Sequence, residues 1–149
     1  MPAFITFGRI LFAVLFIASG AMKFLNLGGT AEMIGGKVIF PELAAPYVTQ
    51  LQGLTGMASN QMLAIAAATI ELLGGILIAL NFGARFFAMV MVLFVIAATF
   101  YFHDFWTQTG PEAANNMIHA LKNLSLIGGL FMIAGIGRGP TINHAYNEV

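Results

Sequence analysis

Four long apolar stretches dominate this chain and are separated by short polar or glycine-containing segments. They cover residues 4–25, 62–82, 84–102 and 117–137. About 20 helical residues cross the roughly 30 Å hydrocarbon layer of a bilayer, so each stretch is predicted to be a transmembrane helix. The pattern therefore predicts an all-α membrane protein: a four-transmembrane-helix antiparallel bundle that forms a single domain over residues 1–149.

The connections between these stretches constrain how the helices are arranged. The second and third stretches are joined only by Asn81-Phe82-Gly83, a turn sequence that predicts a tight antiparallel hairpin. The connection over residues 26–61 is long and is interrupted by glycine pairs and prolines. Apolar residues recur in it at helical spacing, which predicts one or two short amphipathic helices on the outer surface of the bundle: Leu43, Tyr47, Leu51 and Leu54.

The composition supports a membrane protein and narrows its chemistry. Hydrophobic residues make up 59% and charged residues 8% of the chain, with a mean hydropathy of +0.88, whereas soluble domains are about a quarter charged. Six basic and six acidic residues leave no net charge, so no nucleic-acid partner is expected. Because the chain has no cysteine, any redox role requires a bound cofactor or a partner protein.

The distribution of basic residues predicts the orientation of the bundle. Arg9, Arg85 and Arg138 fall at the ends of the spans that face the chain termini, whereas the loops on the opposite side contain only Lys37. By the positive-inside rule, both termini are predicted to be cytoplasmic. Lys23 lies inside the first span and is treated as an intramembrane group, as is Lys122 in the fourth.

Glu71 lies in the middle of the second apolar stretch. A carboxylate near the bilayer centre costs roughly 2.5–3.5 kcal/mol even on insertion scales, so a partner or a function is expected for it. Glu71 belongs to a stripe of small residues, which predicts that it faces the interior of the bundle: Ala67, Glu71, Gly75 and Ala79. Counting residues from the outer ends of the spans favours Lys122 as its basic partner, followed by Lys23.

Two interpretations of Glu71 are open. In the preferred one, an ion pair with a lysine sets the register of the helices. In the other, the carboxylate contacts a ligand such as a quinone headgroup. A quinone carbonyl needs a hydrogen-bond donor, for which Lys23, Lys122 and His103 are candidates. Its reduction needs a proton source, for which Glu71 and Asp104 are candidates.

His103 and Asp104 follow the third span directly, and Phe105 and Trp106 come next. His119 is predicted to lie at a similar depth in the fourth span, so the two imidazole rings are expected to be able to meet. The preferred interpretation is anchoring at the membrane interface. A proton or ligand site is the alternative. Two histidines and a carboxylate are also capable of ligating a metal, but no metal site is predicted.

Several short motifs, in this order and spacing, make the chain similar to the DoxX family of small four-span bacterial membrane proteins. The similarity covers nearly the whole length and rests on the following motifs: Arg9, Ser19-Gly20-Ala21-Met22-Lys23-Phe24, Glu71-Leu72-Leu73-Gly74-Gly75, Gly83-Ala84-Arg85, His103-Asp104-Phe105-Trp106, Lys122-Asn123-Leu124 and Gly128-Gly129. This resemblance implies a multi-pass protein of the inner membrane. It also implies a membrane subunit or partner of a redox enzyme, as in a thiosulfate:quinone oxidoreductase.

Two functions are therefore considered. The first, which is preferred, is an accessory subunit of a redox or energy-conserving membrane complex, with a buried Glu/Lys polar cluster and with lipid and other membrane subunits as its partners. The second is a quinone-binding or quinone-reducing subunit, with quinone as its one candidate cofactor. The candidate catalytic residues are Glu71, Lys122, Lys23, His103 and Asp104. The candidate cofactor-binding residues are Glu71, Lys122, Asn123, His103 and Trp106.

Overall fold

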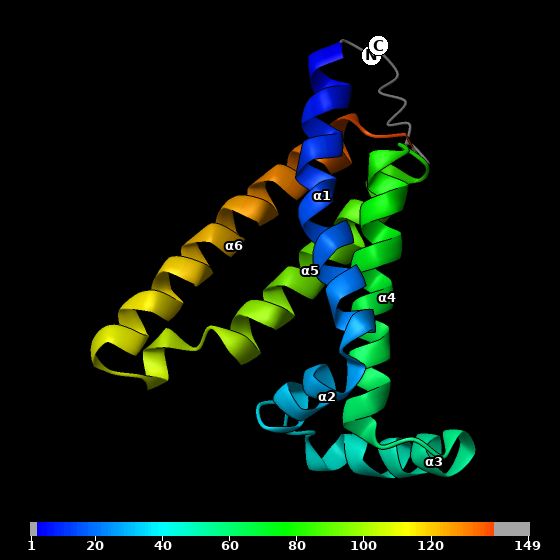
Figure 1. Cartoon of the computed structure of the whole chain (residues 1–149), viewed down its shortest axis with the longest axis vertical. Coiled ribbons are helices and arrows are strands. Elements are labelled where there is room, and N and C mark those ends of the chain that lie inside the picture. The colour runs from blue at the N-terminus through cyan, green and yellow to red at the C-terminus, as the bar shows by residue number, and fades with distance from the viewer. Residues whose placement is uncertain (1–2, 139–149) are drawn as a thin grey trace, which may run out of the picture.

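The computed structural model describes residues 3–138, and most of this part of the chain is helical (Figure 1). Within it, four helices are long and apolar enough to cross a membrane, which confirms the predicted all-α membrane fold. The α-helices are α1 (Ala3–Leu25), α2 (Leu27–Gly35), α3 (Ala45–Thr55), α4 (Ser59–Ala79), α5 (Ala84–Phe102) and α6 (Gly110–Ile136), and the short 3-10 helices are η1 (Glu42–Ala44) and η2 (Phe105–Thr107).

The observed helix ends differ from the predicted spans where polar residues continue or stop a helix. The third predicted span coincides with α5, but α4 ends three residues before the predicted boundary, at Ala79. Asn81 and Gly83 adopt positive φ angles of 58° and 57° and reverse the chain into α5. Helix α6 begins seven residues earlier than predicted, at Gly110, because its first two turns are helical but polar.

Helices α1 and α4 lie side by side and antiparallel, as Figure 1 shows. Their backbones approach closely at two glycines. A Cβ atom on Gly20 of α1 would lie 2.5 Å from the backbone nitrogen of Leu72 and 2.9 Å from the carbonyl oxygen of Ala68. A Cβ atom on Gly75 of α4 would lie 3.3 Å from the carbonyl oxygen of Ala13. Small residues at these points permit the close packing that is common between membrane helices.

The buried face of α4 is close to the predicted stripe but rotated from it. Glu71 and Gly75 are buried as predicted, whereas Ala67 and Ala79 are only half-buried. The buried residues of α4 recur alternately four and three residues apart, a spacing that is common when two helices cross at a small angle. The buried residues of α4 are Ala64, Ala68, Glu71, Gly74, Gly75 and Ile78.

Helices α5 and α6 form a second antiparallel pair, which is tilted away from α1 and α4 (Figure 1). The two pairs meet at the end where α1 begins and α6 ends. Near this end, a Cβ atom on Gly129 of α6 would lie 2.7 Å from the ring of Phe12 in α1. The shared core includes Phe16, Ile78, Met91, Val92, Val95 and Leu130.

The long connection between α1 and α4 contains helices, as predicted, but only part of it lies on the surface. Helix α2 packs against α4 and buries Thr30, Ala31 and Ile34. Helix α3 has no buried residues and lies across the end of the bundle that is opposite the start of α1 (Figure 1). The ammonium of Lys37, after α2, lies 3.3 Å from Asp104 after α5, so the α1–α4 and α5–α6 connections are linked by an ion pair.

Candidate functional site

A cavity of about 660 Å³ lies between α1, α2, α4, α5 and α6. It is formed in the half of the bundle where α5 and α6 diverge from α1 and α4 (Figure 1). Its volume falls within the roughly 300–1,000 Å³ that is common for small-molecule sites. Apolar side chains form most of its wall, including Leu63, Ile70, Phe94, Val95 and Leu126.

A small set of polar side chains interrupts this apolar wall. Apolar walls with a few converging polar groups are typical of ligand sites, because the apolar surface excludes water and the polar groups fix orientation. Five helices and the residue after α5 contribute these groups: Ser19, Lys23, Thr30, Glu71, Tyr101, His103, His119 and Asn123.

Glu71 and Lys23 form an ion pair in the wall of the cavity. The ammonium Nζ of Lys23 lies 2.5 Å from Oε2 of Glu71. The hydroxyl of Ser19 donates to the same oxygen over 3.0 Å, and Lys23 donates to this hydroxyl over 2.7 Å. Ser19 and Lys23 are four residues apart on one face of α1. The close approach of α1 at Gly20 therefore brings both side chains to Glu71.

The second carboxylate oxygen of Glu71 is available in this arrangement. Glu71 is only 6% exposed, yet it lines the cavity. Both hydrogen bonds that its carboxylate accepts within the described residues reach Oε2. Oε1 accepts no hydrogen bond from the described residues, and it is not fully enclosed. A ligand in the cavity therefore has an acceptor oxygen to contact.

Lys122 is not the partner of Glu71, so the predicted order of the two lysines is wrong. Its side chain is exposed and does not line the cavity. The cavity-facing residues of α6 include His119 and Asn123, and Lys122 is rotated about 100° from Asn123 around the helix. Because α6 is also tilted away from α4, similar depth along the membrane normal does not bring Lys122 close to Glu71.

The two histidines meet, as the sequence suggested. The rings of His103 and His119 are stacked, with centroids 5.0 Å apart and an interplanar angle of 13°. Nδ1 of His103 is 3.1 Å from the side-chain oxygen of Asn116. Asn123 donates to the hydroxyl of Thr99 over 2.9 Å and so links α6 to α5 at the cavity wall.

Asp104 and Trp106 lie outside this cavity. Asp104 accepts hydrogen bonds from Thr107, from Gln108 over 3.2 Å and from Lys37 over 3.3 Å. These contacts order the turn after α5 and fit the interface-anchoring interpretation. Within residues 3–138, no three histidine, aspartate or glutamate side chains are grouped so that they could hold a metal.

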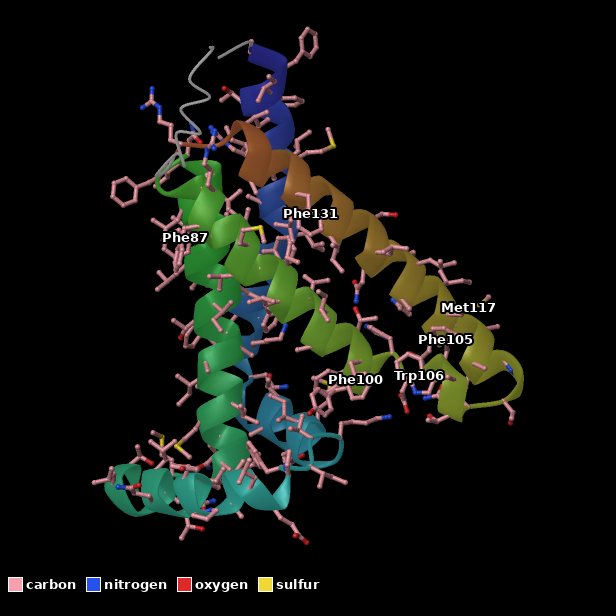
Figure 2. The ribbon with its side chains drawn as sticks, turned by 180° about the vertical axis from the view of Figure 1, so that it is seen from behind. Phe87, Phe100, Phe105, Trp106, Met117 and Phe131 are labelled. Atoms are coloured by element: carbon pink, nitrogen blue, oxygen red, sulfur yellow. The ribbon has the colours of Figure 1, made fainter. Side chains whose placement is uncertain are left out.

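Trp106 belongs to an aromatic cluster on another surface of the α5–α6 pair. Its ring centroid is 5.2 Å from that of Phe105 and 5.8 Å from that of Phe100. Figure 2 shows these three residues beside Met117 at the end of the pair that is remote from Phe87 and Phe131. They line a second, apolar groove of about 370 Å³. Of the candidate cofactor-binding residues, Glu71, His103 and Asn123 therefore line the cavity, Trp106 lines the groove, and Lys122 lines neither.

Sequence reasoning missed three polar residues of the cavity. Ser19 lies one helical turn before Lys23, so the i, i+4 spacing carried a usable signal. Tyr101 lies near the end of α5, where an aromatic residue is typical of the membrane interface whether or not it lines a cavity. Thr30 lies in α2. Hydropathy does not predict that α2 packs against α4, because the pattern of this connection is typical of a surface segment.

A model of the DoxX family matches residues 4–104. The chain is similar to "Inner membrane protein YphA" of Escherichia coli (strain K12), with 27% identity over 138 residues that cover 93% of this chain and 86% of that protein. No solved structure matches the chain.

Proposed function

This chain belongs to the DoxX family and is a multi-pass protein of the inner membrane, and we propose that it binds a quinone as a membrane subunit serving a redox enzyme. The observation that carries the proposal is the Lys23–Glu71 pair in the wall of a cavity that is otherwise mostly apolar. A quinone combines a polar ring with an apolar tail, and the cavity offers both kinds of surface.

The polar groups suit both redox states of such a ligand. An ammonium has three N–H donors, and Lys23 uses two of them on Ser19 and Glu71. The third is available for a quinone carbonyl. A quinol hydroxyl needs an acceptor instead, and Oε1 of Glu71 is available for it. Donor and acceptor therefore stand beside each other, so the oxidised and reduced ligands are bound by the same pair.

The other polar residues of the wall offer contacts for a second ring oxygen. His103 and His119 each carry one donor and one acceptor nitrogen when neutral, and both line the cavity. Tyr101 adds an aromatic face and a hydroxyl. The apolar residues between these groups and the lipid are suited to the isoprenoid tail.

In this proposal the electron-transferring centre belongs to a partner protein. Redox enzymes are the partners that the family resemblance implies. Wide apolar faces of the helices are exposed, including Leu93 and Phe100 on α5 and Leu124 and Met132 on α6. Membrane subunits and lipid are the occupants proposed for these faces. The arginine-bearing end is proposed to face the cytoplasm, which places the cavity in the outer half of the membrane.

A purely structural role for the ion pair is the second candidate, and the contact at Gly20 favours it. Tight packing at this glycine places Lys23 against Glu71 without any ligand. Under this interpretation the protein remains an accessory subunit, and the pair only sets the register of α1 and α4.

Quinone binding to the purified protein distinguishes the two roles. Isothermal titration with a short-chain ubiquinone in detergent is expected to show binding to the wild type. The double variant Lys23→Met, Glu71→Leu is expected to bind at least tenfold more weakly, because both the donor and the acceptor are lost. Lys122→Met is the matched control, since this lysine lies outside the cavity, and it should bind as the wild type does.

Two results would contradict quinone binding in the cavity. One is no binding to the wild type when solvent extraction of the same preparation also finds no quinone. The other is equal binding by the wild type and the folded double variant. Quenching of the fluorescence of Trp106, the single tryptophan, would add that the ligand occupies the apolar groove instead.

A further inference from the structure

Arg9 is a buried cation for which residues 3–138 provide no hydrogen-bond partner. It lies six residues after the start of α1, and the residue is only 7% exposed. Its Nε and Nη1 atoms are fully enclosed and have no hydrogen-bond partner. A buried guanidinium without a counter-group lowers stability, because its desolvation is not compensated. A partner that the protein chain does not supply within residues 3–138 is therefore expected.

The surroundings of Arg9 are basic. Arg138 follows the end of α6, is exposed, and repels the Arg9 charge. Arg85, at the start of α5, is already used: its Nε donates to the carbonyl of Gly137 over 2.7 Å and its Nη2 to that of Gly135 over 3.1 Å. It therefore caps the last turn of α6 and leaves Arg9 and Arg138 to bind an anion.

No acidic residue of the described chain lies at this end. The described carboxylates are found in α2, in η1, in the middle of α4, after α5 and in the first turn of α6: Glu32, Glu42, Glu71, Asp104 and Glu112. Both ion pairs within residues 3–138 involve lysines of the opposite half. Within the described part of the chain, the end where α1 begins and α6 ends thus carries arginines and no carboxylate.

We propose that Arg9 and Arg138 bind the phosphate group of an anionic phospholipid at this face of the membrane. Guanidinium groups match phosphate oxygens with paired N–H donors. Nη2 is the one guanidinium nitrogen of Arg9 that is not fully enclosed. The phosphate is therefore proposed to approach Arg9 from the side of Nη2. Arg9 is roughly 9 Å along α1 from its first residue at 1.5 Å per residue, a depth that suits a lipid headgroup better than a dissolved ion.

A lipid is proposed as the occupant of the Arg9 site because phospholipids are concentrated around the protein and because Arg9 lies at the depth of their headgroups. Phospholipid phosphates surround a membrane protein at all times, and basic pockets between transmembrane helices bind anionic headgroups. Free phosphate offers the same oxygens but has no acyl chains to hold it at this depth. The proposal is independent of quinone binding, because the two sites lie at opposite ends of the bundle.

The test measures the thermal unfolding midpoint of the full-length protein after delipidation in detergent. Adding phosphatidylglycerol is expected to raise the midpoint by several degrees, and native mass spectrometry should show one retained lipid. Phosphatidylcholine at the same concentration should not raise it. Arg9→Gln and Arg138→Gln should lose most of the shift. Lys122→Gln removes the same charge from an exposed site at the other end and should keep it.

If Arg9→Gln does not fold, Arg138→Gln still tests the same site, because Arg138 is exposed and its replacement is expected to be tolerated. An equal shift with phosphatidylcholine, or a full shift in Arg138→Gln, would overturn the proposal. An equal shift with inorganic phosphate would show that a dissolved anion is bound and not a lipid.

Discussion

At the scale of single residues, the Lys23–Glu71 ion pair joins α1 to α4 and gives the cavity its main polar groups. The cost of a midspan carboxylate identified Glu71 from the sequence alone, and the structure pairs it with a lysine, as expected. The choice between Lys122 and Lys23 was wrong because residue counting gives depth along a helix but not its rotation or tilt. Ser19 and Tyr101 were missed for the same reason, since their roles depend on which face of the helix meets the cavity.

Replacing only one member of the pair is expected to destabilise the protein. Lys23→Met leaves the Glu71 carboxylate buried and uncompensated, which should lower the free energy of unfolding by about 3 kcal/mol. The double variant Lys23→Met, Glu71→Leu should recover most of this loss, because an apolar pair needs no compensation. Thermal unfolding in one detergent checks both. Lys122→Met is the control, and a larger loss in this control would contradict the assigned pairing.

At the scale of elements, hydropathy located the four spans well and failed at their polar ends. Helix α6 starts seven residues before the predicted boundary, because hydropathy averages treat polar helical turns as loop. Helix α2 was expected on the surface, yet it buries Thr30 and Ala31 against α4. Such packing depends on which residues face each other, and a short apolar pattern does not specify this.

Glycine substitutions in α1 test the close contact with α4. Gly20→Ala places a Cβ atom 2.5 Å from the backbone nitrogen of Leu72, so α1 must move away from α4. We expect a clearly lower unfolding midpoint and a weaker Lys23–Glu71 pair. Gly8→Ala is the matched control in the same helix, because a Cβ atom there meets nothing within 4 Å. Equal midpoints for both variants would contradict the role given to Gly20.

At the scale of the whole molecule, the number of spans was predictable and the cavity was not. Span number follows from apolar length, and the α4–α5 hairpin follows from a turn of a few residues. The tilt between the two helix pairs has no such signal. Lipid tails are as apolar as the helix faces, so hydropathy does not distinguish a helix neighbour from lipid. The cavity between the two helix pairs therefore could not be predicted from the sequence.

The orientation of the bundle gives a prediction for the whole chain. With Arg9, Arg85 and Arg138 at the cytoplasmic face, a green fluorescent protein fused after Val149 should fluoresce. Alkaline phosphatase inserted between η1 and α3 should be active, since it requires the oxidising side of the membrane. The reverse pair of results would place the arginines on the outer side and move the cavity into the cytoplasmic half.

The length of α6 links the cavity to the thickness of the bilayer. Its 27 residues include two polar first turns, so its apolar part, residues 117–136, spans about 30 Å and matches a hydrocarbon layer of roughly that thickness. When the layer is thinner than the apolar part, a helix adapts by tilting. A thinner membrane favours a larger tilt and a wider space between the helix pairs, whereas a thicker one brings α6 closer to upright. The volume of the site is therefore a mechanical property of the protein and its lipids together.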